Sequence, residues 1–154
     1  MAVKAIPDGY HTITPYLMVR GAAKAIDFYK QAFGAKELVR MPQPDGRVGH
    51  AELEIGDSMV MLADEAPGTL IQGPESLGGT AVSLVIYDAD VDATFHRAVA
   101  AGGKVLRPLA DQFYGDRTGT LRDPFGHIWT VATHKEDVSP EEMKKRMQAA
   151  HAKA

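Results

Sequence analysis

The feature that most constrains the fold is a hairpin near residue 125 that has a counterpart about 70 residues earlier. A tight turn is predicted at Asp123-Pro124-Phe125-Gly126, because proline presets φ and glycine takes the φ > 0 position that closes the turn. The run that follows, up to Val131, is β-branched and aromatic and favours a strand. Gly56-Asp57 turns the earlier segment, and Gly34 and Gly103 end two helical patterns at nearly the same offset. Two landmarks with one offset indicate an internal duplication.

Each repeat is predicted to run β-α-β-β-β. Period-2 alternation and β-branched runs mark the strands, and apolar residues spaced along one face mark the helix. The expected elements are strands at 12–19, 35–41, 47–55 and 58–63 with a helix at 21–34, then strands at 81–87, 104–109 and around the hairpin with a helix at 91–101. Ser139 and Pro140 form the N-cap and first residue of a last helix.

These elements predict an α+β fold in which two tandem βαβββ modules form a cupped mixed sheet, with a C-terminal helix. The modules are expected at 10–64 and 81–134, joined by a Gly- and Pro-rich linker at 65–80 and followed by a helical tail at 135–154. A chain of 154 residues suits one compact domain of this kind.

Composition excludes several classes of function. A formal charge of −3 and a pI near 6.0 give no reason to expect nucleic acid or an anionic membrane surface as a partner. The absence of cysteine excludes disulfides, thiolate metal sites and cysteine nucleophiles. No apolar run is long enough to cross a bilayer, and the segment 1–10 carries Lys4, Pro7 and Asp8 in place of an apolar signal core. We therefore expect a cytoplasmic protein with a small-molecule ligand.

The segment from Val48 to Ile55 contains the most reactive group of side chains. His50, Glu52 and Glu54 alternate with apolar residues and so share one face of a strand. If that face lines a pocket, His50 and Glu52 are candidates for a catalytic base and the carboxylate that orients it, or for two metal ligands. If it faces water, the three are the polar side of an amphipathic strand. Periodicity alone leaves these alternatives open.

A second candidate group lies in the loop that enters the central hairpin. Arg117 can receive a ligand carboxylate or phosphate, and Tyr114 can stack on a ligand or donate to it. The alternative is that Asp116 and Arg117 pair within the loop and fix its shape. In the hairpin itself, Trp129 is expected to pack in the core against a helix, and His127 to bond to backbone.

Several of these segments together resemble the vicinal oxygen chelate superfamily, which includes glyoxalase I and the bleomycin-resistance proteins. The resemblance rests on Ile26-Asp27-Phe28-Tyr29 in the first helix and Asp123-Pro124-Phe125-Gly126-His127 before the last strand. Within the superfamily the chain is similar to the PhnB-like branch, through Thr14-Pro15-Tyr16-Leu17, Gly49-His50-Ala51-Glu52-Leu53 and Gln112-Phe113-Tyr114-Gly115-Asp116-Arg117. The resemblance implies the duplicated fold already predicted, and a homodimer.

The resemblance also implies where a metal would be held. In metal-dependent members, four ligands come from the first and last strands of the two modules and face one cup. The corresponding positions are Thr14, Met61, Ser83 (or Val82) and Thr130. Hydroxyls and a thioether do not make a competent site for Zn²⁺, Mn²⁺ or Fe²⁺. We therefore expect no metal and no other cofactor.

The expected function is metal-independent binding of a small, largely apolar molecule, an antibiotic or a metabolite, in the cup. The alternative is a lyase, isomerase or dioxygenase with a rearranged site involving His50 and Glu52. The residues expected to line the ligand site are Thr14, Tyr16, Met59, Met61, Ser83, Tyr114, Arg117 and Thr130.

Overall fold

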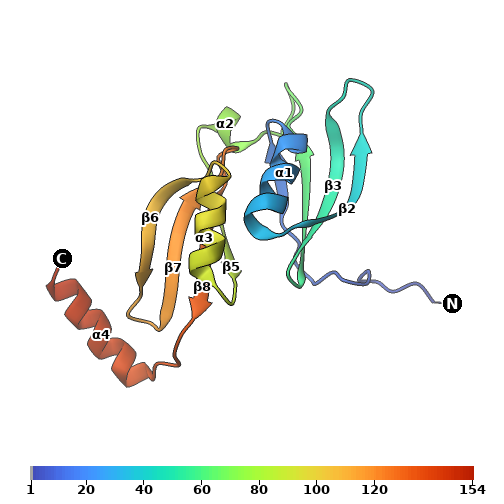
Figure 1. The fold of residues 1–154 in the computed structure, drawn as a ribbon. Helices are drawn as coiled ribbons and strands as arrows, with labels where there is room; N and C mark the ends of the chain where they lie inside the picture. Colours follow the sequence, from blue (N-terminus) through green and yellow to red (C-terminus); the bar gives the residue numbers. More distant parts are fainter. Residues whose placement is uncertain (1) are drawn as a thin grey trace.

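The computed structural model describes residues 2–154 and contains two four-stranded mixed sheets, one for each repeat (Figure 1). The first repeat comprises β1 (Tyr16–Val19), α1 (Ala22–Phe33), β2 (Lys36–Pro42), β3 (Val48–Ile55) and β4 (Ser58–Asp64). Its strand order is β1-β4-β3-β2, with β1 parallel to β4 and the other pairs antiparallel.

The second repeat has the same order of elements. It comprises β5 (Ser83–Tyr87), α3 (Val91–Ala100), β6 (Lys104–Asp111), β7 (Asp116–Arg122) and β8 (Ile128–His134). Its strand order, β5-β8-β7-β6, repeats that of the first sheet, including the parallel first pair. The predicted α+β fold, with its duplicated βαβββ order, is confirmed.

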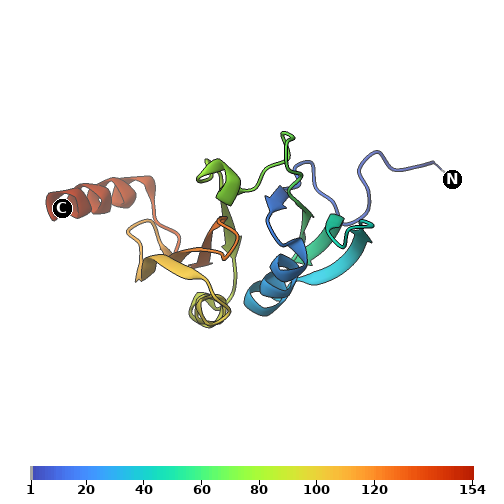
Figure 2. The same cartoon turned by 90° about the horizontal axis from the view of Figure 1, so that it is seen from above.

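The core lies where the two helices meet the sheets. In Figure 2, α1 and α3 lie next to each other on one side of the molecule, and they are in contact. The face of each sheet that packs against the helices is apolar, and we call the opposite face its open face. Val19, Leu53, Leu62, Leu121 and Val131 are among the fully buried side chains between sheets and helices.

Two elements differ from the sequence prediction. The first strand begins at Tyr16 and not at residue 12, because Pro15 has no N–H for the ladder and contributes only its carbonyl, which accepts from Met61 N at 2.9 Å. The predicted linker contains a one-turn helix, α2 (Pro74–Leu77), between Gly73 and Gly78. Glycine and proline in this segment indicate a loop in the sequence, but in the structure they begin and end a short helix.

The C-terminal helix α4 (Pro140–Ala152) begins as predicted, with the Ser139 side chain accepting from Glu142 N. None of its residues is buried, and in Figure 2 it projects from the second module on the side away from α1 and α3. Arg146 holds it to the module through bonds to Glu136 and to the Phe113 carbonyl. Of the helices in the described part of the chain, none is both long and apolar enough to span a membrane.

The carboxylate of Asp123 joins the two modules. Its Oδ1 accepts from the backbone N–H groups of Phe125 and His127, both at 2.9 Å, and so fixes the turn of the central hairpin. Its Oδ2 accepts from Trp129 Nε1 at 2.9 Å and from the Tyr29 hydroxyl of α1 at 2.6 Å. Burial, followed by the nearby Asp123 charge, raises the pKa of Tyr29 well above its usual range, so Tyr29 remains a donor.

We predict that Tyr29→Phe lowers the free energy of unfolding by about 1–3 kcal/mol, because a buried carboxylate loses one of its charge-assisted donors. Asp123→Ala should cost more, since it leaves four donors without their acceptor. Urea denaturation followed by circular dichroism measures both. Tyr114→Phe, at a side chain that is 39% exposed, is the matched control and should change stability little. A Tyr29→Phe protein as stable as the parent would contradict the assigned role.

Candidate functional site

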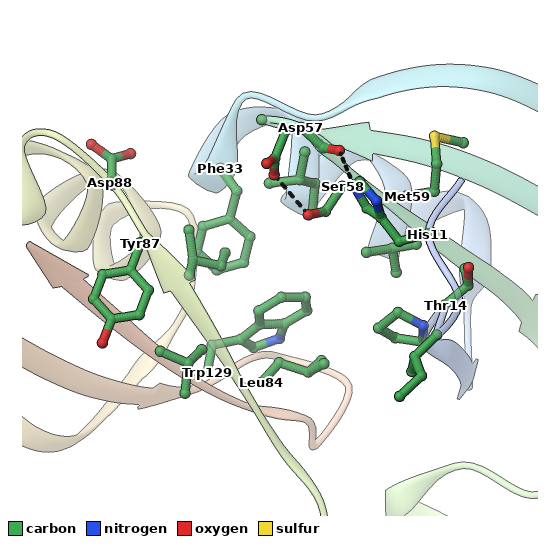
Figure 3. Close-up of a pocket in the computed structure, with 17 residues that line it drawn as sticks. His11, Thr14, Phe33, Asp57, Ser58, Met59, Leu84, Tyr87, Asp88 and Trp129 are labelled. Atoms are coloured by element: carbon green, nitrogen blue, oxygen red, sulfur yellow. Dashed lines mark hydrogen bonds between the residues drawn. The ribbon is translucent and has the colours of Figure 1, made fainter. Parts of the chain in front are cut away.

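A cleft of about 720 Å³ lies between the two modules (Figure 3). One wall is formed by the β3–β4 turn and the start of β4, the other by β5, and the segment from His11 to Pro15 borders it. Phe33, at the end of α1, and Trp129, in β8, contribute aromatic rings from the two modules. The volume is within the range of small-molecule sites.

The interior of the cleft is apolar. The rings of Phe33 and Trp129 are 4.8 Å apart between centroids, and Trp129 is only 2% exposed. Leu84 and Ile86 reach the cleft from the helix-facing side of β5, while Val60 reaches it from β4. Trp129 therefore has the predicted core position, and it also forms part of a cavity wall, which the sequence pattern did not indicate.

The rim of the cleft is polar and carries acidic groups from both modules. Asp57 accepts from Ser58 Oγ at 2.8 Å, and its backbone carbonyl accepts from His11 Nε2 at 3.2 Å. Asp88 lies across the opening, where its carboxylate accepts from Thr94 Oγ1 at 2.8 Å. Among residues 2–154, no lysine or arginine lines this cleft, so a ligand anion would meet neither of these cations at the rim.

The open face of the first sheet carries His50 and Glu52, whose side chains are each 22% exposed. Ala51, Leu53 and Ile55 point to the opposite, helix-covered side. His50 Nδ1 lies 2.6 Å from the Tyr16 hydroxyl, and His50 Nε2 lies 3.1 Å from Glu52 Oε1. The structure therefore brings together two candidate catalytic residues and one candidate ligand-binding residue.

The N-terminal arm, residues 2–15, borders the same face. Ile6, Pro7, Tyr10 and Thr14 enclose a hollow of about 480 Å³ with Glu52 and Met61. The Tyr10 hydroxyl is buried without a partner in hydrogen-bond geometry, yet it lies next to Glu52. Burial and this carboxylate raise the pKa of Tyr10 to about 12.

The open face of the second sheet has a different composition. Val85 and Thr130 are neighbours across β5 and β8, and Thr130 bonds to Thr120 at 2.8 Å between hydroxyl oxygens. Ser83 lies exposed at the start of β5 and borders a shallow hollow with Thr120 and Thr130. Met59, by contrast, is buried in the first module and lines the cleft.

A cluster that the sequence analysis did not identify lies at the ends of β5, β7 and β8. The buried carboxylate of Asp116 accepts from Tyr87 Oη at 2.8 Å and contacts His134 Nδ1 at 2.7 Å. Asp116, then Asp137, raises the pKa of His134 by hydrogen bonding. Tyr87, Asp116 and His134 come from three strands, so only the sheet order brings them together.

Arg117 is paired within the protein. Its guanidinium makes two bonds of 2.9 Å to Asp92 of α3 and one of 3.3 Å to Asp111. The alternative pairing of Asp116 with Arg117 within the loop is wrong, because Arg117 lies in β7 and bonds mainly to Asp92 of α3, while Asp116 bonds to Tyr87 and His134. Tyr114 is 39% exposed in the loop beyond β6, and its ring contacts Phe113. His127 bonds to backbone as predicted, with Nε2 donating to the Met18 carbonyl at 2.9 Å.

The positions that correspond to metal ligands carry weak donors. Met61 lies between Tyr16 and Glu52 in the strand register, and Thr130 lies between Val85 and Thr120. Within residues 2–154, no three His, Asp or Glu side chains are grouped so that they could hold an ion. A thioether and neutral hydroxyls are poor ligands for the divalent ions of this kind of site.

Comparisons with known proteins agree with this fold. The chain is 44% identical over 150 residues to protein Mb0911c of Mycobacterium bovis, a match that covers 96% of each chain. Among solved structures, TioX from Micromonospora sp. ML1 superposes with a TM-score of 0.64 at 30% identity, covering 80% of this chain and 98% of TioX.

The PhnB protein from Bacillus cereus has the same fold, with a TM-score of 0.64 at 24% identity over 80% of this chain and 99% of that protein. A family model matches residues 9–131, which is most of the chain and reaches from the first module into β8, the last strand of the second. This protein therefore belongs to the glyoxalase/bleomycin resistance protein/dioxygenase superfamily, and its structural neighbours include PhnB-like members.

Proposed function

We propose that this protein binds a small, largely apolar molecule in the cleft between its two modules, without a metal ion. The observation that carries the proposal is the apolar cavity of about 720 Å³ with Phe33 and Trp129 in its wall. Ligand sites are typically concave and apolar, with a few polar groups that fix orientation. Here the polar groups are those of the rim, Asp57, Ser58 and Asp88.

The family supports binding as well as catalysis, since its description includes bleomycin resistance proteins. The side chains at the metal-ligand positions argue for binding, because they are hydroxyls and a thioether, which are poor metal ligands. These residues are Thr14, Met61, Ser83 and Thr130. An antibiotic or a metabolite of mainly apolar surface fits the lining. An acidic rim disfavours ligands that carry a carboxylate or phosphate close to the opening.

The binding proposal predicts that the neutral fluorescent dye Nile red binds to the full chain and changes the fluorescence of Trp129, the single tryptophan. Ser58→Phe should weaken binding about tenfold or more, because a ring at this exposed rim position narrows the opening. Fluorescence titration measures both. Ala23→Phe, an equal addition on the exposed side of α1, is the control. Dye affinity that is unchanged in Ser58→Phe, or a parent protein that does not bind the dye, would contradict a site in the cleft.

We further propose that the protein acts as a homodimer. Val85 and Tyr87 on the open face of the second sheet, which also border the cleft, are 58% and 66% exposed, and Met41 on the edge strand β2 is 57% exposed. Uncovered apolar side chains on sheet faces and edges commonly mark protein interfaces. A second copy is the simplest partner, since one symmetric contact covers the same surface on both chains.

Sedimentation equilibrium at micromolar concentration should therefore give twice the chain mass of 16.6 kDa. Val85→Arg should shift the distribution toward the single-chain mass, because a charge would be buried at the contact. Lys24→Arg on α1, which is exposed, should leave the mass unchanged. A parent protein that sediments as a single chain would overturn the dimer.

A further inference from the structure

Three side chains on the open face of the first sheet form a continuous hydrogen-bonded line that the cleft does not include. Tyr16 on β1 reaches His50 at 2.6 Å, and His50 reaches Glu52 at 3.1 Å, both on β3. In the strand register Tyr16 and Glu52 flank Met61 of β4, so the line crosses above that methionine. We call Tyr16, His50 and Glu52 the relay.

The direction of the bond between His50 and Glu52 follows from the charge of Glu52. Tyr10, and after it His50, holds the pKa of Glu52 below its usual range, so Glu52 is a carboxylate that can only accept. His50 must then carry its proton on Nε2, facing Glu52. In the neutral imidazole this leaves Nδ1 as an acceptor, which receives the Tyr16 hydroxyl proton.

The second module is an internal comparison for this arrangement. The row of β-sheet neighbours Tyr16, Met61 and Glu52 corresponds to Val85, Thr130 and Thr120, at the same strand order and register. The second row contains no titratable group, yet its sheet forms in the same way. The fold therefore does not require titratable groups at these three positions, although the second module has its own hydrogen-bonded cluster of Tyr87, Asp116 and His134 farther along the strands.

The surroundings of the relay suit a small ligand. Tyr16 is 43% exposed on the open face. Beside Glu52, the hollow between the arm and the sheet is lined by Met61 and by apolar residues of the arm. His50 is hydrogen-bonded to Tyr16 and Glu52, and Tyr10 lies beyond Glu52. Glu54, the next residue on this face, is paired with Lys36.

We propose that the relay is a proton-accepting site for a phenol or enol whose hydroxyl is acidic, with an apolar body. The ligand hydroxyl donates to Tyr16 Oη. As its proton moves to that oxygen, the Tyr16 proton moves to His50 Nδ1, and the electron pair of the ligand O–H bond stays on the ligand oxygen. The products are a ligand oxyanion that accepts from Tyr16 and an imidazolium beside the Glu52 carboxylate. No other reactant is needed.

Tyr16 is the contacting residue of this site, whereas His50 and Glu52 are positioning residues that accept the proton and stabilise it. A ligand hydroxyl that is more acidic than an ordinary phenol gives up its proton to such a site most readily. The site lies on the first sheet, away from the residues that form the cleft wall in β5 and β8.

The test uses 4-nitrophenol and the full chain at a pH below the pKa of the free probe. Binding should produce the visible absorption of the phenolate, rising to saturation as protein is added. Tyr16→Phe and Glu52→Gln should each lower the amount of bound phenolate about tenfold or more. Glu52→Gln should also move the appearance of bound phenolate to higher pH, because the imidazolium loses its counter-charge.

Glu54→Gln is the matched control, since it removes a carboxylate from the same strand face outside the relay, and it should leave the phenolate signal unchanged. Circular dichroism shows that each variant is folded. The proposal is overturned if the parent protein binds the probe only as neutral phenol or not at all. It is also overturned if Glu52→Gln and Glu54→Gln have the same effect on the signal or on its pH profile.

Discussion

The buried carboxylate of Asp123 is the contact on which the relation between the two modules depends. One oxygen closes the turn that begins the last strand, and the other accepts from Trp129 and from Tyr29 of the opposite module. A local turn and a long-range contact are thus made by a single side chain. Because Trp129 also lines the cleft, the shape of that cavity depends on the same carboxylate.

Much of the fold could be predicted from the chain because its signals are local. Glycines at matched offsets marked the two hairpins and helix ends, and Gly34 ends α1 in the left-handed conformation, with φ of 67°, as expected. Alternation assigned Ala51, Leu53 and Ile55 to the buried side of β3. The one-turn helix α2 was missed because its flanking glycines and its proline are also loop residues.

The candidate site was less predictable because its contacts depend on strand order. Tyr16 and His50 lie on β1 and β3, with β4 between them, so no sequence spacing places them together. The same holds for Arg117, which bonds to Asp92 on a helix and not to its neighbour Asp116. The cleft is formed from both modules, and neither repeat alone contains it.

The arm has a consequence for how the protein can vary. It contains no strand or helix before Tyr16, yet Tyr10 lies beside Glu52 and His11 bonds to the carbonyl of Asp57 at the cleft rim. Substitutions before Pro15 can therefore alter both cavities without removing a backbone bond of either sheet.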